Sequence, residues 1–262
     1  MRSRIFWGSV LIILGLIFLF SYQVGFSIWN LVWPFAIIVA GGWLLLLPYL
    51  YQGIEIPRDE ISVPLEDAKS ATIKIEHGAG SIRLTAADLP SILLKGSFLG
   101  GVHSHVSSTD GKKHIKLQSK VEFMNFLPRF QKDQRLLWDL SVNQKVPLKV
   151  KMETGASDNY LDLRASQLKE LHLETGASTT EIFLPEKAGG TRVHIESGAS
   201  TIRIHVPKNV AASIKIGGLI GKTIDTERFK KEGDVYKSAG YAEAANKAEI
   251  EIESGVGSIE ID

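Results

Sequence analysis

The sequence contains no cysteine among its 262 residues. This absence excludes disulfide bonds, zinc sites built on cysteine, and catalysis by a thiol. The chain also lacks an excess of either charge, because 30 Lys and Arg against 29 Asp and Glu leave a formal net charge of +1. A charge this small gives no reason to expect nucleic acid as a partner.

Motifs that carry enzyme chemistry are missing as well. The spacing of residues points to no Ser/His/Asp arrangement, no paired carboxylates for acid–base catalysis and no cofactor fingerprint. His103 and His105 would share one face of a strand, a spacing that metals can use, but no further ligand follows at a clear spacing. We therefore expect no catalytic residues, no cofactor and no bound metal.

Charged residues are absent from two apolar stretches near the N-terminus, residues 5–22 and 31–50. Each is close to the roughly 20 residues that a helix needs to cross a bilayer. The sequence therefore predicts a membrane-anchored all-β protein, with a two-helix transmembrane hairpin over residues 1–52. A linker over residues 53–60 would lead into a β-solenoid-like repeat domain over residues 61–262.

The orientation of this hairpin follows from a few basic residues. Arg2 and Arg4 precede the first stretch, Arg58 follows the second, and the connecting segment has no Lys or Arg. The positive-inside rule then places both ends of the hairpin, and the C-terminal domain, in the cytoplasm. Small residues in both stretches would allow close packing within the hairpin or against a partner's helices. They are Gly8, Gly15, Ala40, Gly41 and Gly42.

A short motif, Glu-x-Gly followed by two small residues, occurs five times in the rest of the chain. Its copies begin at Glu76, Glu153, Glu174, Glu196 and Glu253. Each copy follows an alternating apolar and polar run, and most lead into a second one, which is typical of half-buried strands. Gly155 and Gly176 are 21 residues apart, and Gly198 follows 22 residues later. A fixed period of about 20 residues is typical of a solenoid whose rungs stack to bury a shared core.

The alternation also predicts which side chains face the core. If Leu171 and Leu173 point inward, His172 and Glu174 point outward and the small Thr175 turns in. Val193 and Ile195 would be buried in the same way. The five glutamates would then form an outward column, and because like charges on neighbouring strands repel, staggering or nearby Lys and Arg must stabilise it. The column could bind a cation, but we favour a solvated face that discourages edge pairing.

The glycines of the motif are the residues to which we assign a structural role. A glycine permits a bend, or a close approach of backbones where a Cβ atom would clash. The five are Gly78, Gly155, Gly176, Gly198 and Gly255.

Between residues 84 and 149 the repeat lapses, although strand-like runs continue over residues 92–98, 102–106, 114–117 and 136–142. A turn at Thr109-Asp110-Gly111 fits a hairpin. This region is predicted to be a meander or a broken set of rungs that caps the solenoid. Residues 123–138 mix apolar and basic side chains, so they either pack inside or touch a membrane surface or partner.

The C-terminal part continues the repeat with one interruption. Residues 214–218 resemble a degenerate sixth rung, and residues 248–261 are predicted to form the last one. Between them, residues 225–247 carry Phe229, Tyr236 and Tyr241, which we expect to cover the end of the solenoid, because terminal rungs must be capped.

Two parts of the sequence resemble a known family. The stretches near the N-terminus are similar to the transmembrane hairpin of LiaF-type bacterial envelope-stress proteins. The C-terminal part resembles the toastrack β-repeat domain often joined to that hairpin. Besides the five repeats, the residues that carry the resemblance are Arg4-Ile5-Phe6-Trp7-Gly8, Ile12-Ile13-Leu14-Gly15, Trp33-Pro34-Phe35, Gly41-Gly42-Trp43, Leu137-Trp138-Asp139-Leu140, Val146-Pro147-Leu148, Val206-Pro207 and Gly255-Val256-Gly257-Ser258.

The resemblance implies a non-enzymatic, membrane-anchored regulator in cell-envelope stress signalling, which acts by contact with a sensor histidine kinase. The repeat leaves a second hypothesis open, a membrane-tethered structural scaffold that self-assembles through its β-solenoid. Expected partners are therefore the lipid bilayer, a two-component sensor kinase or other membrane protein, and further copies of this chain. Nucleic acid is not expected.

Overall fold

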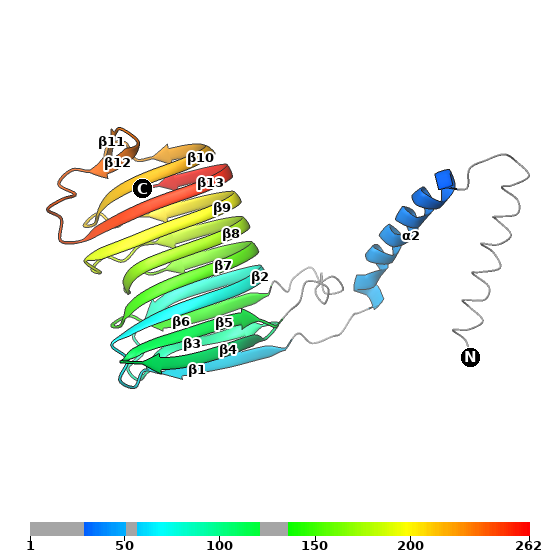
Figure 1. Ribbon diagram of the computed structural model, residues 1–262, viewed down its shortest axis with the longest axis horizontal. Coiled ribbons are helices and arrows are strands. Elements are labelled where there is room, and N and C mark those ends of the chain that lie inside the picture. The colour runs from blue at the N-terminus through cyan, green and yellow to red at the C-terminus, as the bar shows by residue number, and fades with distance from the viewer. Residues whose placement is uncertain (1–28, 51–56, 121–135) are drawn as a thin grey trace, which may run out of the picture. The chain divides into compact units, whose positions relative to one another are not determined.

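The computed structural model describes residues 29–50, 57–120 and 136–262 of the chain (Figure 1). The chain divides into two compact units, one containing the helix and the other containing the strands, and each is described by itself. The helix α2, Trp29–Leu50, covers the second apolar stretch. Many of its large apolar side chains are exposed: Val32, Trp33, Phe35, Ile37, Ile38, Val39, Trp43 and Leu46.

The predicted transmembrane hairpin is not supported by this structure. Within residues 29–50, 57–120 and 136–262, no helix has the combination of length and hydropathy needed to cross a membrane. The first predicted span, residues 5–22, lies outside the described residues.

The second unit is one sheet of 13 strands. Their bounds are β1 Arg58–Pro64, β2 Ser70–Ala87, β3 Ile92–Leu99, β4 Val102–Thr109, β5 Lys112–Ser119, β6 Leu137–Asn143, β7 Pro147–Asp162, β8 Gln167–Phe183, β9 Gly190–His205, β10 Ala211–Ile224, β11 Phe229–Glu232, β12 Val235–Ser238 and β13 Lys247–Ile261. Because β1 begins at Arg58, the last residues of the expected linker over residues 53–60 already belong to the sheet.

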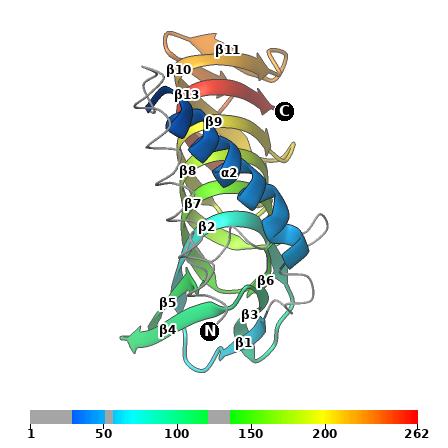
Figure 2. The same cartoon turned by 90° about the vertical axis from the view of Figure 1, so that its right-hand side faces the viewer.

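Each copy of the motif lies in the middle of one long strand, in β2, β7, β8, β9 and β13. Neighbouring long strands pair in parallel and keep the copies in register. The ribbon views show that each long strand bends at the motif into two arms, and that the bent strands stack as rungs (Figures 1 and 2). The predicted β-repeat architecture is therefore confirmed for the β unit.

The core lies between the two arms of the rungs, and the alternation of residues selects it. Leu171, Leu173, Val193 and Ile195 are each at most 2% exposed, as predicted. Residues of the second arm, such as Ile182, are buried from the other side of the same core. Burying one such side chain contributes about 1.5–3 kcal/mol, so a column of identical rungs gains stability with each addition.

The order of the rungs differs from the prediction at the C-terminal end. β13 lies between β9 and β10, so the terminal long strand is β10 and not the last strand of the chain (Figure 1). β13 pairs in parallel with both neighbours along nearly its whole length, which satisfies the backbone groups on both of its edges. The sequence similarity of the rungs could not reveal this order, because each rung offers the same register to either neighbour.

The irregular half contains one rung that is split in two. β5 pairs in parallel with the first arm of β2, where Gln118 lies opposite Glu76. β6 pairs in parallel with the second arm, starting with Leu137 opposite Ser81. The two arms of this rung are thus separated in the sequence by residues 120–136, of which 121–135 lie outside the described residues. Of the segment 123–138, the described Leu136 and Trp138 are buried, and Leu137 is partly exposed.

Both ends of the stack carry additional strands. β3 and then β1 continue the sheet beyond β6 by antiparallel pairing. At the other end the hairpin of β11 and β12 covers the first part of β10, where Phe229 is fully buried and Tyr236 packs against the core. The expectation that aromatic residues of the interruption cover the end of the solenoid is confirmed for these two.

Candidate functional site

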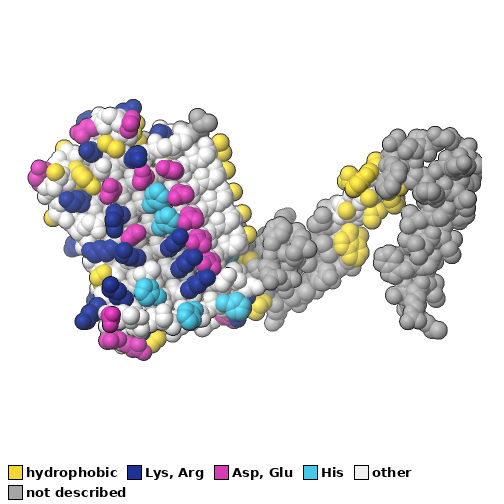
Figure 3. All heavy atoms as spheres, viewed as in Figure 1, with side chains coloured by type: hydrophobic (Ala, Val, Ile, Leu, Met, Phe, Trp, Pro, Cys, Tyr) yellow, Lys and Arg dark blue, Asp and Glu magenta, His cyan; other side chains and the backbone are white. Residues whose placement is uncertain are grey.

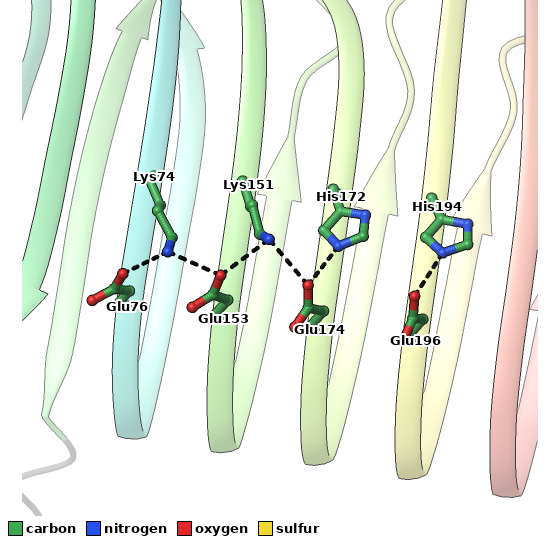
Figure 4. Close-up of polar contacts among 8 residues, drawn as sticks. All are labelled: Lys74, Glu76, Lys151, Glu153, His172, Glu174, His194 and Glu196. Carbon is green, nitrogen blue, oxygen red and sulfur yellow. Dashed lines mark hydrogen bonds and ion pairs between the residues drawn. The ribbon is translucent and has the colours of Figure 1, made fainter.

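Four neighbouring rungs present a regular row of charged side chains on their first arms (Figure 4). We call this row the charged ladder. The parallel register places each residue beside its counterpart on the next rung, because the side chains of these positions all point away from the core. Its members are Lys74, Glu76, Lys151, Glu153, His172, Glu174, His194 and Glu196.

Each lysine of the ladder bridges two glutamates. The Nζ atom of Lys74 lies 2.7 Å from Oε1 of Glu76 on its own strand and 3.0 Å from Oε1 of Glu153 on the next rung. Lys151 repeats the arrangement at 3.2 Å from both Glu153 and Glu174. The expectation that lysines lie beside the glutamate column is therefore confirmed for Glu76, Glu153 and Glu174.

Histidine replaces lysine at the other end of the ladder. Nε2 of His172 lies 2.7 Å from Oε1 of Glu174, and Nε2 of His194 lies 2.9 Å from Oε1 of Glu196. The two imidazole rings stack with their centroids 5.1 Å apart and their planes at 10°. Nδ1 of His194 also lies 3.6 Å from Oε2 of Glu251 on β13.

The contacts shift the pKa values of the ladder. Hydrogen bonds from Lys74 lower the pKa of the Glu76 and Glu153 carboxyls, and the hydrogen bond with His172, followed by that from Lys151, lowers the pKa of Glu174. The same pairs raise the pKa of both lysines, above all through Glu76 for Lys74 and Glu153 for Lys151. All these groups are therefore ionised near neutral pH, and because they are partly exposed to solvent, the pairs contribute little to stability.

A groove of about 870 Å³ lies beside the ladder, where the rungs bend. Carboxylates line it together with hydroxyl-bearing side chains and glycine backbone. The lining residues are Glu153, Thr154, Glu174, Thr175, Gly176, Glu196, Ser197, Gly217, Gly218, Glu253, Ser254 and Gly255. The groove therefore crosses several rungs and offers acceptor oxygens and hydroxyls along a line perpendicular to the strands.

The glycines of the motif act through close approach and not through a strained backbone. A Cβ atom on Gly155 would lie 2.3 Å from the carbonyl oxygen of Gly78, and on Gly176 it would lie 2.9 Å from that of Gly155. Gly198 and Gly255 repeat the relation at 2.7 and 2.6 Å. At Gly78, no atom of the described part of the chain lies within 4 Å of the Cβ position. None of these five has a positive φ.

The remaining candidates are placed away from the ladder. His103 and His105 lie exposed on β4. Among the residues that the structure describes, no group of three or more His, Asp or Glu side chains could hold a metal ion.

The predictions missed a set of polar residues inside the bend. His77 is 2% exposed and packs edge-on against Trp138, with ring centroids 4.5 Å apart. In the next rungs, Nδ2 of the buried Asn159 donates to Oγ of Ser157 and to Oγ1 of Thr180 at 3.0 and 3.1 Å. The sequence contains one indication of these residues. Asn159 is polar, although it lies opposite the apolar Ile82 of the neighbouring rung.

On the face shown in Figure 3, basic, acidic and histidine side chains run in rows across the rungs. The arrangement presents a patterned set of opposite charges beside an open groove. Surfaces of this kind favour recognition of a charged macromolecule, because complementary charges select the partner and the register of binding.

Comparison with solved structures identifies relatives of the fold. A protein of Clostridium sporogenes ATCC 15579, provisionally described as a cell adhesion protein, is 21% identical, with a TM-score of 0.70 over 79% of this chain and 98% of its own. A protein of Bacteroides fragilis NCTC 9343, provisionally described as an adhesin, is 9% identical over 80% of this chain and 98% of its own, and its TM-score of 0.26 is too low to inform the fold. No curated protein matches the sequence significantly.

A comparison with protein families matches residues 52–205, which is more than half of the chain. The match spans β1 to β9, and with them the whole charged ladder. The toastrack part of the resemblance seen in the sequence is thereby confirmed, whereas the LiaF-type membrane hairpin is not. The chain belongs to the family described as the N-terminal domain of toast_rack, DUF2154.

Proposed function

We propose that this protein is a non-enzymatic regulator of bacterial cell-envelope stress signalling, which acts by contact of its charged ladder with a sensor histidine kinase. The ladder is the observation that carries the proposal. It displays alternating charges across four rungs at fixed spacing, and its glutamates are held ionised by Lys74, Lys151 and His172. Because these groups are solvated and individually weak as stabilisers, their regular placement is better suited to recognition than to folding.

The place of action in this proposal is the membrane surface. Its support is the resemblance of residues 5–22 and 31–50 to a LiaF-type hairpin, together with the exposed apolar side chains of α2, such as Trp33, Phe35 and Trp43. Large exposed apolar surfaces generally mark contact with a membrane or a partner. The β unit would then be on the cytoplasmic side, as the basic residues near the N-terminus favour.

The alternative is a membrane-tethered scaffold that grows by stacking of solenoid ends. Such growth needs a terminal rung with a free edge. β12 pairs with β10 from Ser213 to Lys215, so part of the edge at that end is already occupied. We therefore prefer the regulator.

The contact can be tested in cells that carry an envelope-stress reporter. Lys151→Glu reverses one charge of the ladder, and Arg203→Glu is the matched control, because Arg203 forms a similarly exposed ion pair with Glu260 on the second arm. At equal protein levels, K151E should lower the amount of sensor kinase cross-linked to the protein and raise basal reporter expression. R203E should change neither. Equal effects of both variants, or no kinase cross-linked to the unmodified protein, would contradict the proposal.

The membrane side is tested separately. Because the chain has no cysteine, Ser258→Cys on β13 introduces a unique and exposed thiol. An impermeant thiol reagent should label it only after intact cells are opened. Labelling in intact cells would move the β unit to the outside and remove a cytoplasmic partner.

A further inference from the structure

The strand β4 has one edge that no described strand covers. It pairs antiparallel with β5 from Val102↔Ser119 to Thr109↔Lys112, and within the described residues β5 is its only partner. All of its side chains after Val102 are exposed. Figure 2 shows β4 standing out from the stack of rungs, so its outer backbone N–H and C=O groups face solvent.

The strands at the two ends of the strand order, β1 and β11, carry features that discourage pairing, and β4 does not. β1 begins with Arg58, Asp59 and Glu60 and ends at Pro64, and β11 has four residues, three of them charged. β4 has eight residues and contains no Lys, Arg, Asp, Glu or Pro. Because natural sheets normally protect long edges with charge, proline or short length, an eight-residue edge without any of these is suited to pairing.

β4 is also held in place before any partner arrives. Its first residue, Val102, donates its N–H to Oδ2 of Asp59 at 2.9 Å, and Nζ of Lys120 lies 2.9 Å from the same oxygen. At its far end, Asp110 and Gly111 form the tight turn with φ values of 51° and 71°. A strand fixed at both ends loses little conformational entropy when another strand pairs with it.

We propose that β4 is a self-association strand, which pairs antiparallel with β4 of a second copy of this chain around a two-fold axis. In this arrangement each residue faces one from the same strand, and no Lys, Arg, Asp or Glu faces another because the strand contains none. Because facing residues must point to the same face of the sheet, the axis passes through a residue, and an axis through Val106 places Ser104 opposite Ser108 of the second copy. Their hydroxyl groups can then hydrogen-bond across the pair.

A charged peptide fits the same edge less well. Two of the three lysines on the adjacent β5 already have acidic partners, since Nζ of Lys113 lies 2.8 Å from Glu66 and Nζ of Lys116 lies 3.0 Å from Glu76. Of the β5 lysines, an acidic strand would therefore find only Lys112 without an acidic partner among the described residues, at the far end of β4, and a basic strand would meet like charges. A second copy meets neither difficulty.

The predicted dimer is weak in solution, because a single strand pair is smaller than the roughly 800 Å² per partner of a typical stable interface. The inference concerns the edge of the sheet and does not rest on the proposed signalling function. Its test therefore uses covalent trapping of the full chain, followed by a measurement of mass at high protein concentration.

The trapping experiment uses the absence of native cysteine. Two differently tagged full-length copies, one with Ser104→Cys and one with Ser108→Cys, are co-expressed and oxidised in membranes. The proposed register brings the two thiols together, so a disulfide-linked heterodimer should form. The control replaces Ser104→Cys by Ser62→Cys, an exposed position on β1, and should give none. Equal yields with the control, or no heterodimer, would overturn the proposed register.

The second measurement does not depend on register. Sedimentation of the purified full chain in detergent at high concentration should show a dimer. Val106→Lys should raise the dissociation constant of this dimer at least tenfold, so that more of the variant is monomeric at the same concentration. Val106 is 42% exposed, so the lysine should leave the fold intact, which circular dichroism checks. A dimer that persists in V106K, or a monomer at all concentrations in the unmodified chain, would overturn self-association through β4.

Discussion

His77 should make the stability of the β unit depend on pH in a defined window. The side chain is buried at the bend of β2, where the corresponding residue of the next rungs is Thr154 and then Thr175. Neither ring nitrogen has a hydrogen-bond partner among the described residues. Burial without such a partner lowers the pKa of His77 from 6.5 to about 4.

The sign and size of the effect follow from this pKa. Between pH 6.5 and 4 the unfolded chain binds a proton at His77 that the folded chain does not bind, so stability is lost as pH falls through this window. A lowering of about 2.5 pKa units corresponds to a loss of roughly 3 kcal/mol in the free energy of unfolding, of which about 2 kcal/mol is reached at pH 5.

The perturbation is His77→Thr, which installs the residue that the neighbouring rungs use. Urea unfolding of a fragment covering residues 57–262 is followed by the fluorescence of Trp138, its only tryptophan. On going from pH 7 to pH 5, the unmodified fragment should lose about 2 kcal/mol more of its unfolding free energy than H77T loses. The exposed His103→Thr is the control and should show a much smaller shift.

Other titrating groups cancel in this comparison. The carboxyls of Glu76 and Glu153 have lowered pKa values, so the stability they contribute is present above pH 4.5 and is lost below it, in both proteins alike. Parallel curves of unfolding free energy against pH for H77T and the unmodified fragment would refute the argument. They would show that the His77 imidazole is hydrated or hydrogen-bonded in the folded state.

Three further predictions concern other parts of the β unit. Gly155→Ala should destabilise by about 1–3 kcal/mol because its Cβ would lie 2.3 Å from a backbone oxygen, whereas Gly78→Ala, with open space at its Cβ, should be close to neutral in thermal unfolding. Asn143→Ala should cost about 2–3 kcal/mol in urea unfolding, because the buried carbonyls of Leu89 and Ile92 lose their donor, and Asn143→Asp should not rescue it. Lys151→Ala should raise the pKa of the Glu174 carboxyl toward its ordinary value in an NMR titration, and an unchanged pKa would show that the ion pair is not formed in solution.

Much of the repeat could be predicted from the sequence because its period is set by contacts that recur. Alternation at Leu171 and Leu173 identified the buried face, and the lysines two residues before Glu76 and Glu153 indicated how a column of like charges could be stabilised. These features depend on residues close in sequence or one period apart. The turn at residues 109–111 was predicted for the same reason.

Other features depend on interactions that the sequence pattern does not encode. β13 lies between β9 and β10 and pairs in parallel with both. Because every rung can pair with any other in the same register, the repeat does not predict which rungs are neighbours. The split rung was hidden because its two arms, β5 and β6, are separated by a long insertion at the place of the motif. His77 stands at the bend beside this insertion, and its burial against Trp138 depends on the second half of the split rung.

The glycines of the motif show that a residue in one rung can be required by the backbone of the adjacent rung. The Cβ position of Gly155 points at the carbonyl oxygen of Gly78, so the requirement for glycine in one rung is imposed by the backbone of the rung before it. At Gly78 the neighbouring rung is split between β5 and β6, and no atom of the described residues lies within 4 Å of the Cβ position. The motif is nevertheless kept there, and its glutamate is used, because Glu76 accepts from Lys74 and Lys116. The glycine and the glutamate of one motif are thus under separate constraints. The glycine is required by close packing against the preceding rung, and the glutamate is required by its contacts on the charged face. Of the two, only the glutamate retains its contacts at the edge of the regular stack.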